Sequence, residues 1–92
     1  MTEKEAYSKI IDEVLEELKS AMEKHQEWPL PIFEAFTVIS EEVGELAQAI
    51  LDYKHDGKKY ENIKKEALQV AAMGLRFLMN LKDEKEVEKH EK

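Results

Sequence analysis

Residues 32–53 read IFEAFTVISEEVGELAQAILDY, and this stretch decides the fold. Its apolar side chains recur every three or four positions, which is the spacing of one face of an α-helix. They are Ile32, Phe36, Ile39, Val43, Leu46, Ala47 and Ile50. Asp56-Gly57 follows as a turn or C-cap signal. The stretch therefore predicts an amphipathic helix that ends before this turn.

A second helix is predicted over residues 3–24, where the same spacing occurs. Its apolar positions are Tyr7, Ile10, Ile11, Val14, Leu15, Leu18 and Met22. Thr2 followed three residues later by Glu5 has the form of a capping box at its start. The segment Trp28-Pro29-Leu30-Pro31 interrupts the pattern, because proline has no amide hydrogen and pushes the preceding residue out of helical geometry. A connecting loop is expected there.

A third helix is predicted from about Lys59 to Leu81. Between Ala67 and Leu75 its only polar residue is Gln69, so apolar side chains surround this part of the helix. Such a helix is buried on several sides, more than a lone three-helix chain of this size provides. The sequence therefore predicts an all-α, three-helix protomer that assembles into a four-helix-bundle-type homodimer or homotetramer.

The chain has 92 residues, which are enough for one domain with a modest core. We expect this single domain to span residues 1–92, with a core of about 3–81 and a charged C-terminal tail of 82–92. Oligomerisation is the expected supplement to so small a core, because the sequence has no cysteine for a disulfide.

Composition argues against several classes of partner. There are 14 Lys and Arg against 21 Asp and Glu, and a formal charge of -7 opposes the phosphate backbone of a nucleic acid. No apolar run approaches the ~20 residues that span a bilayer. We therefore expect no nucleic-acid or membrane partner, and the absence of cysteine is compatible with a reducing, cytoplasmic location.

Glu41, Glu42 and Glu45 form an E-E-x-x-E pattern in the middle of the second helix. At about 100° per residue they fall within roughly a 100° arc, and no lysine or arginine stands three or four residues away. On the third helix, Glu66 lies beside an apolar stripe, as Glu42 does on the second. Carboxylates that converge from two helices suit Mg²⁺, which prefers hard oxygen ligands. Ordinary solvated glutamates are the alternative that spacing leaves open.

Two stretches resemble the MazG-like all-α nucleoside-triphosphate pyrophosphohydrolases: EEVGELAQAI at 41–50 and KEALQVAAMGLRFL at 65–78. The similarity covers about residues 22–81. It implies an oligomeric hydrolase that uses Mg²⁺, or Mn²⁺ in its place, to cleave a nucleoside triphosphate to the monophosphate and pyrophosphate. That family carries E-E-x-x-E on one helix and E-x-x-D on the next.

The resemblance also implies roles for single residues. Glu42, Glu45 and Glu66 occupy metal-ligand positions, and Glu41 is a further ligand or the catalytic group that orients the attacking water. Gln69 stands where the family has aspartate. Its amide carbonyl can still coordinate a hard cation but brings no charge.

Five further side chains are candidates for substrate binding. Lys54, Lys58 and Arg76 could contact phosphates, although lysines that follow a helix are commonly plain surface charge. Trp28 could stack on a base or plug the end of the bundle, and the plug is favoured. Asn80 could hydrogen-bond a base or cap the third helix.

Three other functions compete with this one: an HD-type phosphohydrolase, a di-iron protein and a non-catalytic binding protein. His25, His55-Asp56 and Asp83 follow the order of an HD-type metal phosphohydrolase, but His55-Asp56 falls in a predicted turn. A ferritin-like di-iron bundle is excluded because the sequence has no Glu-x-x-His pair. A non-catalytic helical oligomer that binds nucleotide or a protein partner is the main alternative, and Gln69 favours it.

Overall fold

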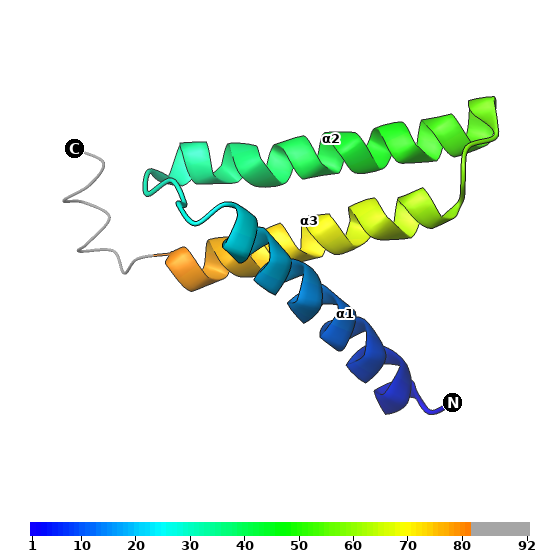
Figure 1. The fold of residues 1–92 in the computed structure, drawn as a ribbon, viewed down its shortest axis with the longest axis horizontal. Coiled ribbons are helices and arrows are strands. Elements are labelled where there is room, and N and C mark those ends of the chain that lie inside the picture. The colour runs from blue at the N-terminus through cyan, green and yellow to red at the C-terminus, as the bar shows by residue number, and fades with distance from the viewer. Residues whose placement is uncertain (82–92) are drawn as a thin grey trace.

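The computed structural model describes residues 1–81 and consists there of three α-helices with no strand, which confirms the predicted all-α class (Figure 1). The predicted charged tail of 82–92 lies outside the described residues. The helices are α1 (Glu3–Lys24), α2 (Ile32–Asp56) and α3 (Glu61–Asn80). Within this part of the chain, no helix is long and apolar enough to cross a membrane.

The helix ends follow local signals in the sequence. The predicted capping box is present: the hydroxyl of Thr2 accepts from the amide of Glu5, and the carboxylate of Glu5 accepts from the amide of Thr2. The second helix continues past the predicted end at Tyr53 to Asp56 and stops at Gly57. Gly57 has φ 67°, the left-handed conformation that terminates many helices.

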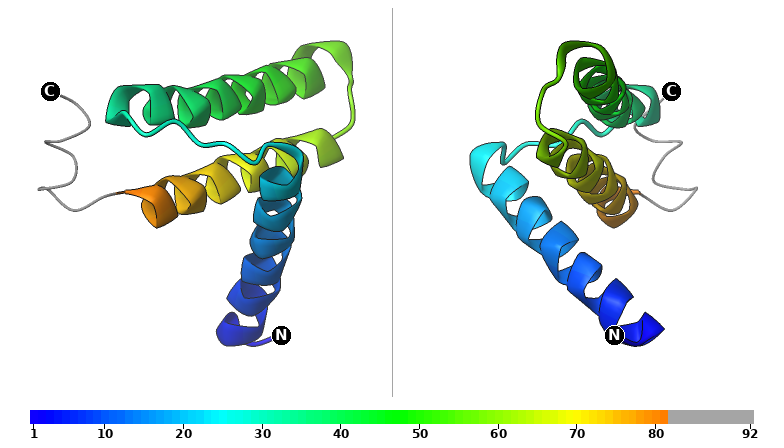
Figure 2. Two further views of the ribbon diagram at one scale, coloured as in Figure 1. Left: turned by 60° about the vertical axis from the view of Figure 1, so that its left-hand side comes forward. Right: turned by 90° about the vertical axis from the view of Figure 1, so that its right-hand side faces the viewer.

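The third helix is central to the arrangement. Helices α2 and α3 run antiparallel as a hairpin, and α1 lies across α3 with its N-terminal half directed away from the hairpin (Figures 1 and 2). Among the described residues, α3 contacts both other helices, whereas α1 and α2 do not pack on each other. This position of α3 explains its predominantly apolar sequence.

The core lies where α1 crosses α3. Val14 and Leu18 of α1 pack against Ala72 and Met73 of α3, and Trp28 from the α1–α2 linker packs onto this cluster. In residues 1–81, six hydrophobic residues are buried, three of them alanines. So small a core provides little hydrophobic stabilisation for a folded monomer.

The packing face of α2 differs from the expectation. The apolar stripe of this helix was expected to face the core, but Phe36, Val43 and Ile50 are each about half exposed. The buried residues are Ala35 and Ala49, which with Glu42 recur every seven positions and face α3. Ile39 of the stripe packs against the core cluster, but among residues 1–81 no other helix covers the half-exposed part of the stripe that carries Phe36, Val43 and Ile50. Glu42 consequently lies within the α2–α3 contact and not at its margin.

Candidate metal centre

Three carboxylates from two helices meet between α2 and α3. One oxygen from each of Glu42, Glu45 and Glu66 lies within 4.8 Å of the other two. Glu42 and Glu45 share a side of α2 because they are three residues apart. Glu66 faces them from α3, because the turn after Gly57 folds α3 back along α2 (Figure 1). The expected convergence of carboxylates from the two helices is therefore present.

Two of these carboxylates are incompletely solvated. One oxygen of Glu42 and one of Glu66 are buried without a hydrogen-bond partner. Among the described residues the ion pair is Lys64–Glu13, which lies outside the cluster. Ionised carboxylates only accept hydrogen bonds, so they cannot satisfy one another. A buried acceptor left unpaired costs about 1–3 kcal/mol.

The pKa values reflect this environment. Burial, followed by the nearby charges of Glu45, Glu66 and Glu41, raises the pKa of Glu42 from 4.5 to about 6. Burial and the charge of Glu45 also raise the pKa of Glu66, although Lys65 acts in the opposite direction. The cluster thus holds more negative charge than its surroundings stabilise, as expected of groups that await a cation.

The donor set fits a hard divalent cation. All three groups offer carboxylate oxygens, the ligand type that Mg²⁺ prefers, and two of the oxygens have no other partner. An octahedral magnesium shell places its oxygens about 3–4 Å apart, so small side-chain rotations bring the cluster to coordination distance. Glu42, Glu45 and Glu66 could hold such an ion.

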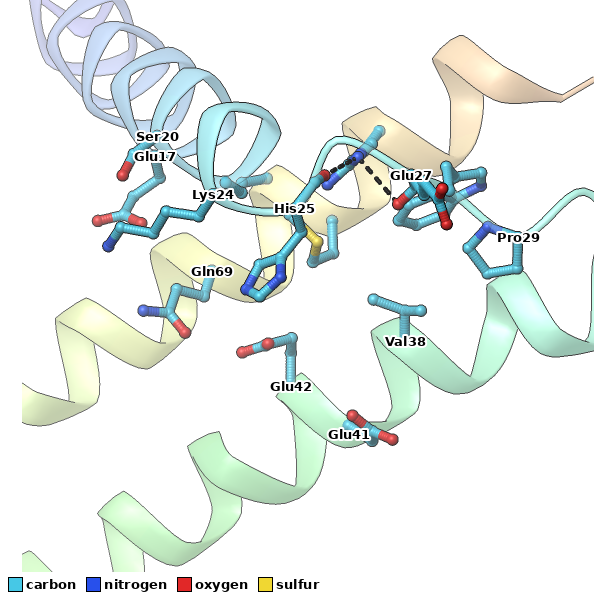
Figure 3. A pocket seen from close by; sticks show the side chains of 15 residues that line it. Glu17, Ser20, Lys24, His25, Glu27, Pro29, Val38, Glu41, Glu42 and Gln69 are labelled. Atoms are coloured by element: carbon cyan, nitrogen blue, oxygen red, sulfur yellow. Dashed lines mark hydrogen bonds between the residues drawn. The ribbon is translucent and has the colours of Figure 1, made fainter.

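A pocket of about 400 Å³ opens beside Glu42. It is bounded by the end of α1, the linker, α2 and α3 (Figure 3). The carboxylate of Glu42 and the amide of Gln69 extend into it from opposite helices, and the imidazole of His25 lies between them (Figure 3). Glu41 and Lys24 also line this pocket. Acceptors and donors therefore surround a space large enough for a nucleoside.

A second cavity of about 370 Å³ lies toward the α2–α3 turn. Glu45 and Glu66 border it together with four other polar residues, Gln48, Asp52, Asn62 and Lys65. The amide of Gln48 donates to Asp52 over 2.8 Å. The carboxylate cluster thus separates two cavities, one with aromatic and apolar walls and one that is almost wholly polar.

The structure places Arg76 and Trp28 at the wall of the first pocket. Arg76 is 5% exposed and donates to the carbonyl oxygens of His25 and Glu27, the latter at 3.3 Å. Its guanidinium carbon lies 5.1 Å from the centre of the Trp28 ring. Trp28 packs on the core, as the favoured role of a plug requires.

The other three substrate candidates lie elsewhere. The amide of Asn80 donates to the carbonyl oxygen of Arg76 at 2.8 Å, so it caps the last turn of α3. Lys54 and Lys58 are exposed near the end of α2 and line neither of the two cavities. Nine residues of helix separate Lys54 from Glu45, a distance of roughly 14 Å.

Sequence reasoning did not assign three cationic or potentially cationic residues to the site: Lys24, His25 and Lys65. Lys65 precedes Glu66 directly, and adjacent helical residues do not share a face, so no spacing rule singles it out. Lys24 and His25 are brought to the pocket by the crossing of α1 over α3. No local pattern in the sequence indicates this tertiary position.

The HD-type arrangement is not formed by the described residues. His25 follows α1 near the start of α2, whereas His55 and Asp56 lie at the opposite end of that helix (Figure 1). A 25-residue helix is about 37 Å long, so these groups cannot share a metal. Asp83 lies outside the described residues.

The sequence matches no protein-family model, and comparisons with curated proteins and with solved structures found no match. The resemblance to the MazG-like pyrophosphohydrolases therefore stays a prediction. The function has to be argued from the geometry of the site.

Proposed function

We propose that this chain is a magnesium-dependent nucleoside-triphosphate pyrophosphohydrolase, which cleaves its substrate to a nucleoside monophosphate and pyrophosphate. The observation that carries the proposal is the cluster of Glu42, Glu45 and Glu66, with two buried, unpaired oxygens, at the mouth of a nucleoside-sized pocket. The alternative is that these are ordinary solvated surface glutamates, which would keep their oxygens in water and their pKa values near 4.5.

In this proposal Glu42, Glu45 and Glu66 hold the metal, with the neutral carbonyl of Gln69 as a further ligand. Bound Mg²⁺ would supply neutralisation of the charge that develops on the phosphates. Glu41 lines the pocket beside the cluster, where it would orient the attacking water and accept its proton. The water oxygen bonds to the α-phosphorus, and the bond from that phosphorus to the bridging oxygen of pyrophosphate breaks.

The two cavities suggest how the substrate would lie. The nucleoside would occupy the pocket near Trp28 and Gln69, and the phosphates would extend past the carboxylates toward Lys65. Lysine ammonium groups bind phosphate as point charges, which makes Lys65 and Lys24 better placed than Lys54 or Lys58. We also propose homodimer or homotetramer formation, which the half-exposed Phe36, Val43 and Ile50 of α2 support.

The test is pyrophosphate release from a panel of ribo- and deoxyribonucleoside triphosphates, with Mg²⁺ and with a chelator. We expect release only with the metal, and loss of at least about 100-fold in Glu45→Gln, because one anionic ligand is removed. Glu16→Gln on the exposed face of α1 is the matched control and should keep full activity.

The same panel separates catalysis from its main alternative. Nucleotide that binds in the presence of Mg²⁺ without release of pyrophosphate would identify a non-catalytic binding protein, the function that the uncharged Gln69 favours. Activity that persists in Glu45→Gln would show that the carboxylate cluster is not the site of the reaction.

A further inference from the structure

Arg76 is the one arginine of the sequence and, within residues 1–81, the one buried charged side chain. No carboxylate neutralises it there: the described ion pair is Lys64–Glu13. Burying a guanidinium without an anionic partner is costly, and an apolar side chain of similar size would fill the same space more favourably. The residue therefore calls for an explanation beyond packing.

Its contacts point to the α1–α2 linker. The guanidinium donates to the carbonyl oxygens of His25 and Glu27, two residues apart at the start of the linker (dashed lines in Figure 3). The amide of His25 donates to the carbonyl oxygen of Ala21 and so closes the last turn of α1. It also stacks against Trp28. His25 is the C-cap of α1, where a cation is favoured by the helix dipole. One side chain of α3 thus contacts the linker at three residues, His25, Glu27 and Trp28.

This attachment determines where the imidazole of His25 lies. The carbonyl of His25 is held by Arg76, and its ring extends from the same residue into the pocket, between Glu42 of α2 and Gln69 of α3 (Figure 3). Because His25 is exposed and outside any helix, its own sequence does little to fix it there. Its amide is held by Ala21 of α1, and its carbonyl oxygen is held by the guanidinium of Arg76.

We propose that Arg76 is a positioning residue that holds the linker so that His25 presents its ring nitrogens to the nucleotide bound beside Glu42. The inference rests on the proposed function for the identity of the ligand. Arg76 then acts through His25, and its nitrogen Nη2 donates to backbone carbonyls of the linker. A direct phosphate contact by Arg76 is the competing account.

Lysine is the discriminating replacement, because it keeps the positive charge but lacks the planar guanidinium that lies over the Trp28 ring while its nitrogen Nη2 donates to both carbonyls. We expect Arg76→Lys to raise KM about 10-fold and to change kcat less than about 3-fold, the signature of lost binding. In a His25→Ala background the same replacement should change KM less than about 2-fold, because residues that act as one unit are not additive. Multiplicative effects in the double variant would overturn the proposal in favour of direct contact.

A second readout does not depend on activity. Trp28 is the one tryptophan, so its fluorescence reports the linker alone. We expect acrylamide to quench Trp28 about twice as strongly in Arg76→Lys, because the stacked guanidinium no longer covers the ring. Lys64→Met, which breaks the α1–α3 ion pair without touching the linker, should leave quenching unchanged. Thermal unfolding by circular dichroism confirms that each variant is folded at the assay temperature.

The two proposals fail separately. Wild-type protein that neither binds nor cleaves nucleotide would refute the proposed function and with it the role of His25 in nucleotide binding, whereas the quenching comparison would still decide whether Arg76 holds the linker. Unchanged quenching in a folded Arg76→Lys variant would overturn the anchoring role even if the enzyme is active.

Discussion

Glu42 couples the stability of the protein to pH. Its pKa is about 6 in the folded protein, against the ordinary glutamate value of 4.5 that applies to the unfolded chain. The folded protein therefore binds a proton at Glu42 more tightly than the unfolded chain does. The stabilising contribution of its protonation is complete below pH ~4.5 and is lost as the pH rises through about 6. Glu66, whose pKa is also raised, acts in the same direction.

We therefore predict that the metal-free protein loses unfolding free energy between pH 5 and 7.5, on the order of 1 kcal/mol after solvent screening of the partly exposed Glu42. Urea unfolding in a chelator at several pH values measures this loss. Glu42→Gln removes the titrating group and should flatten the profile, and Mg²⁺ should stabilise the wild type at pH 7.5 more than at pH 5. A stability that rises over this range without metal would contradict the prediction.

Gln69 is the residue that we expect to set the metal affinity of the proposed centre. Its amide lies across the pocket from Glu42 and has no hydrogen-bond partner in the described part of the chain. We predict that Gln69→Asp, which adds an anionic ligand, tightens Mg²⁺ binding about 10-fold and raises pyrophosphate release. Without metal the added charge faces Glu42 and should lower the melting temperature.

The matched control is Gln69→Asn, which shortens the side chain by the same amount without adding charge. Titrations of Mg²⁺ read by melting temperature and by pyrophosphate release compare the three proteins. An aspartate variant that is destabilised and does not recover with Mg²⁺ would show that residue 69 does not contact the metal.

At the scale of helices, we predict opposite changes in unfolding free energy when alanine replaces Gly44 within α2 or Gly57, the C-cap of α2. Gly57 has φ 67°, where a Cβ is strained, so Gly57→Ala should cost about 1 kcal/mol. Gly44 is in the exposed helix interior, and an added Cβ meets nothing within 4 Å. Gly44→Ala should therefore stabilise by about 0.5–1 kcal/mol. Urea unfolding of both variants checks the signs, and equal signs would show that the end of α2 is misassigned.

Helix identity and boundaries could be predicted because they depend on local signals. Each helix boundary is set by residues that are neighbours in the sequence. The boundaries are the capping box at Thr2, the Trp28–Pro31 break and the αL turn at Gly57. The carboxylate cluster was also predictable, since Glu42, Glu45 and Glu66 have helical spacing and the hairpin connection is short.

Tertiary placement could not be predicted in the same way. The apolar stripe of α2 was expected to face the core, but in the protomer α3 contacts the narrower side that carries Ala35 and Ala49. Periodicity shows that a stripe exists and not which neighbour covers it. Likewise, nothing local places His25 beside Glu42 or turns Arg76 toward the linker. Those contacts depend on the crossing of α1 over α3.

For the molecule as a whole, residues 1–81 expose a large apolar surface, which supports the proposal that the chain assembles. Side chains on α1 and α2 that are between 38% and 71% exposed include Tyr7, Ile10, Ile11, Leu15, Met22, Ile32, Phe33, Phe36, Val43, Ile50, Leu51 and Tyr53. At about half exposure each, they leave on the order of 1,000 Å² uncovered, against about 800 Å² that each partner buries in a standard interface.

The apolar residues of α1 and α2 continue along each helix past its contacts with α3, which favours a second copy of the chain as the partner for this surface. On α1, Tyr7 and Ile11 share the side that carries Val14 and Leu18, which pack on α3, yet the helix has extended beyond α3 by that point (Figure 2). On α2 the stripe from Ile32 to Ile50 is about 27 Å long, and Phe36, Val43 and Ile50 along it are about half exposed. A second copy of the chain carries the same exposed surfaces on α1 and α2. In a twofold-symmetric dimer every contact occurs twice, so these surfaces are buried in both protomers.

We predict an obligate dimer or tetramer in which the α2 stripe is buried. Phe36→Glu places a charge on the stripe and should shift the protein toward monomer and lower its melting temperature, because folding is coupled to association. Thr37→Glu is the matched control: Thr37 is exposed and lies off the stripe on the same helix, so its replacement should leave assembly intact. Light scattering at micromolar concentration gives the mass, and the melting temperature of the wild type should rise with concentration. A stably folded wild-type monomer would contradict the prediction, and equal dissociation by both variants would show that another face of α2 forms the contact.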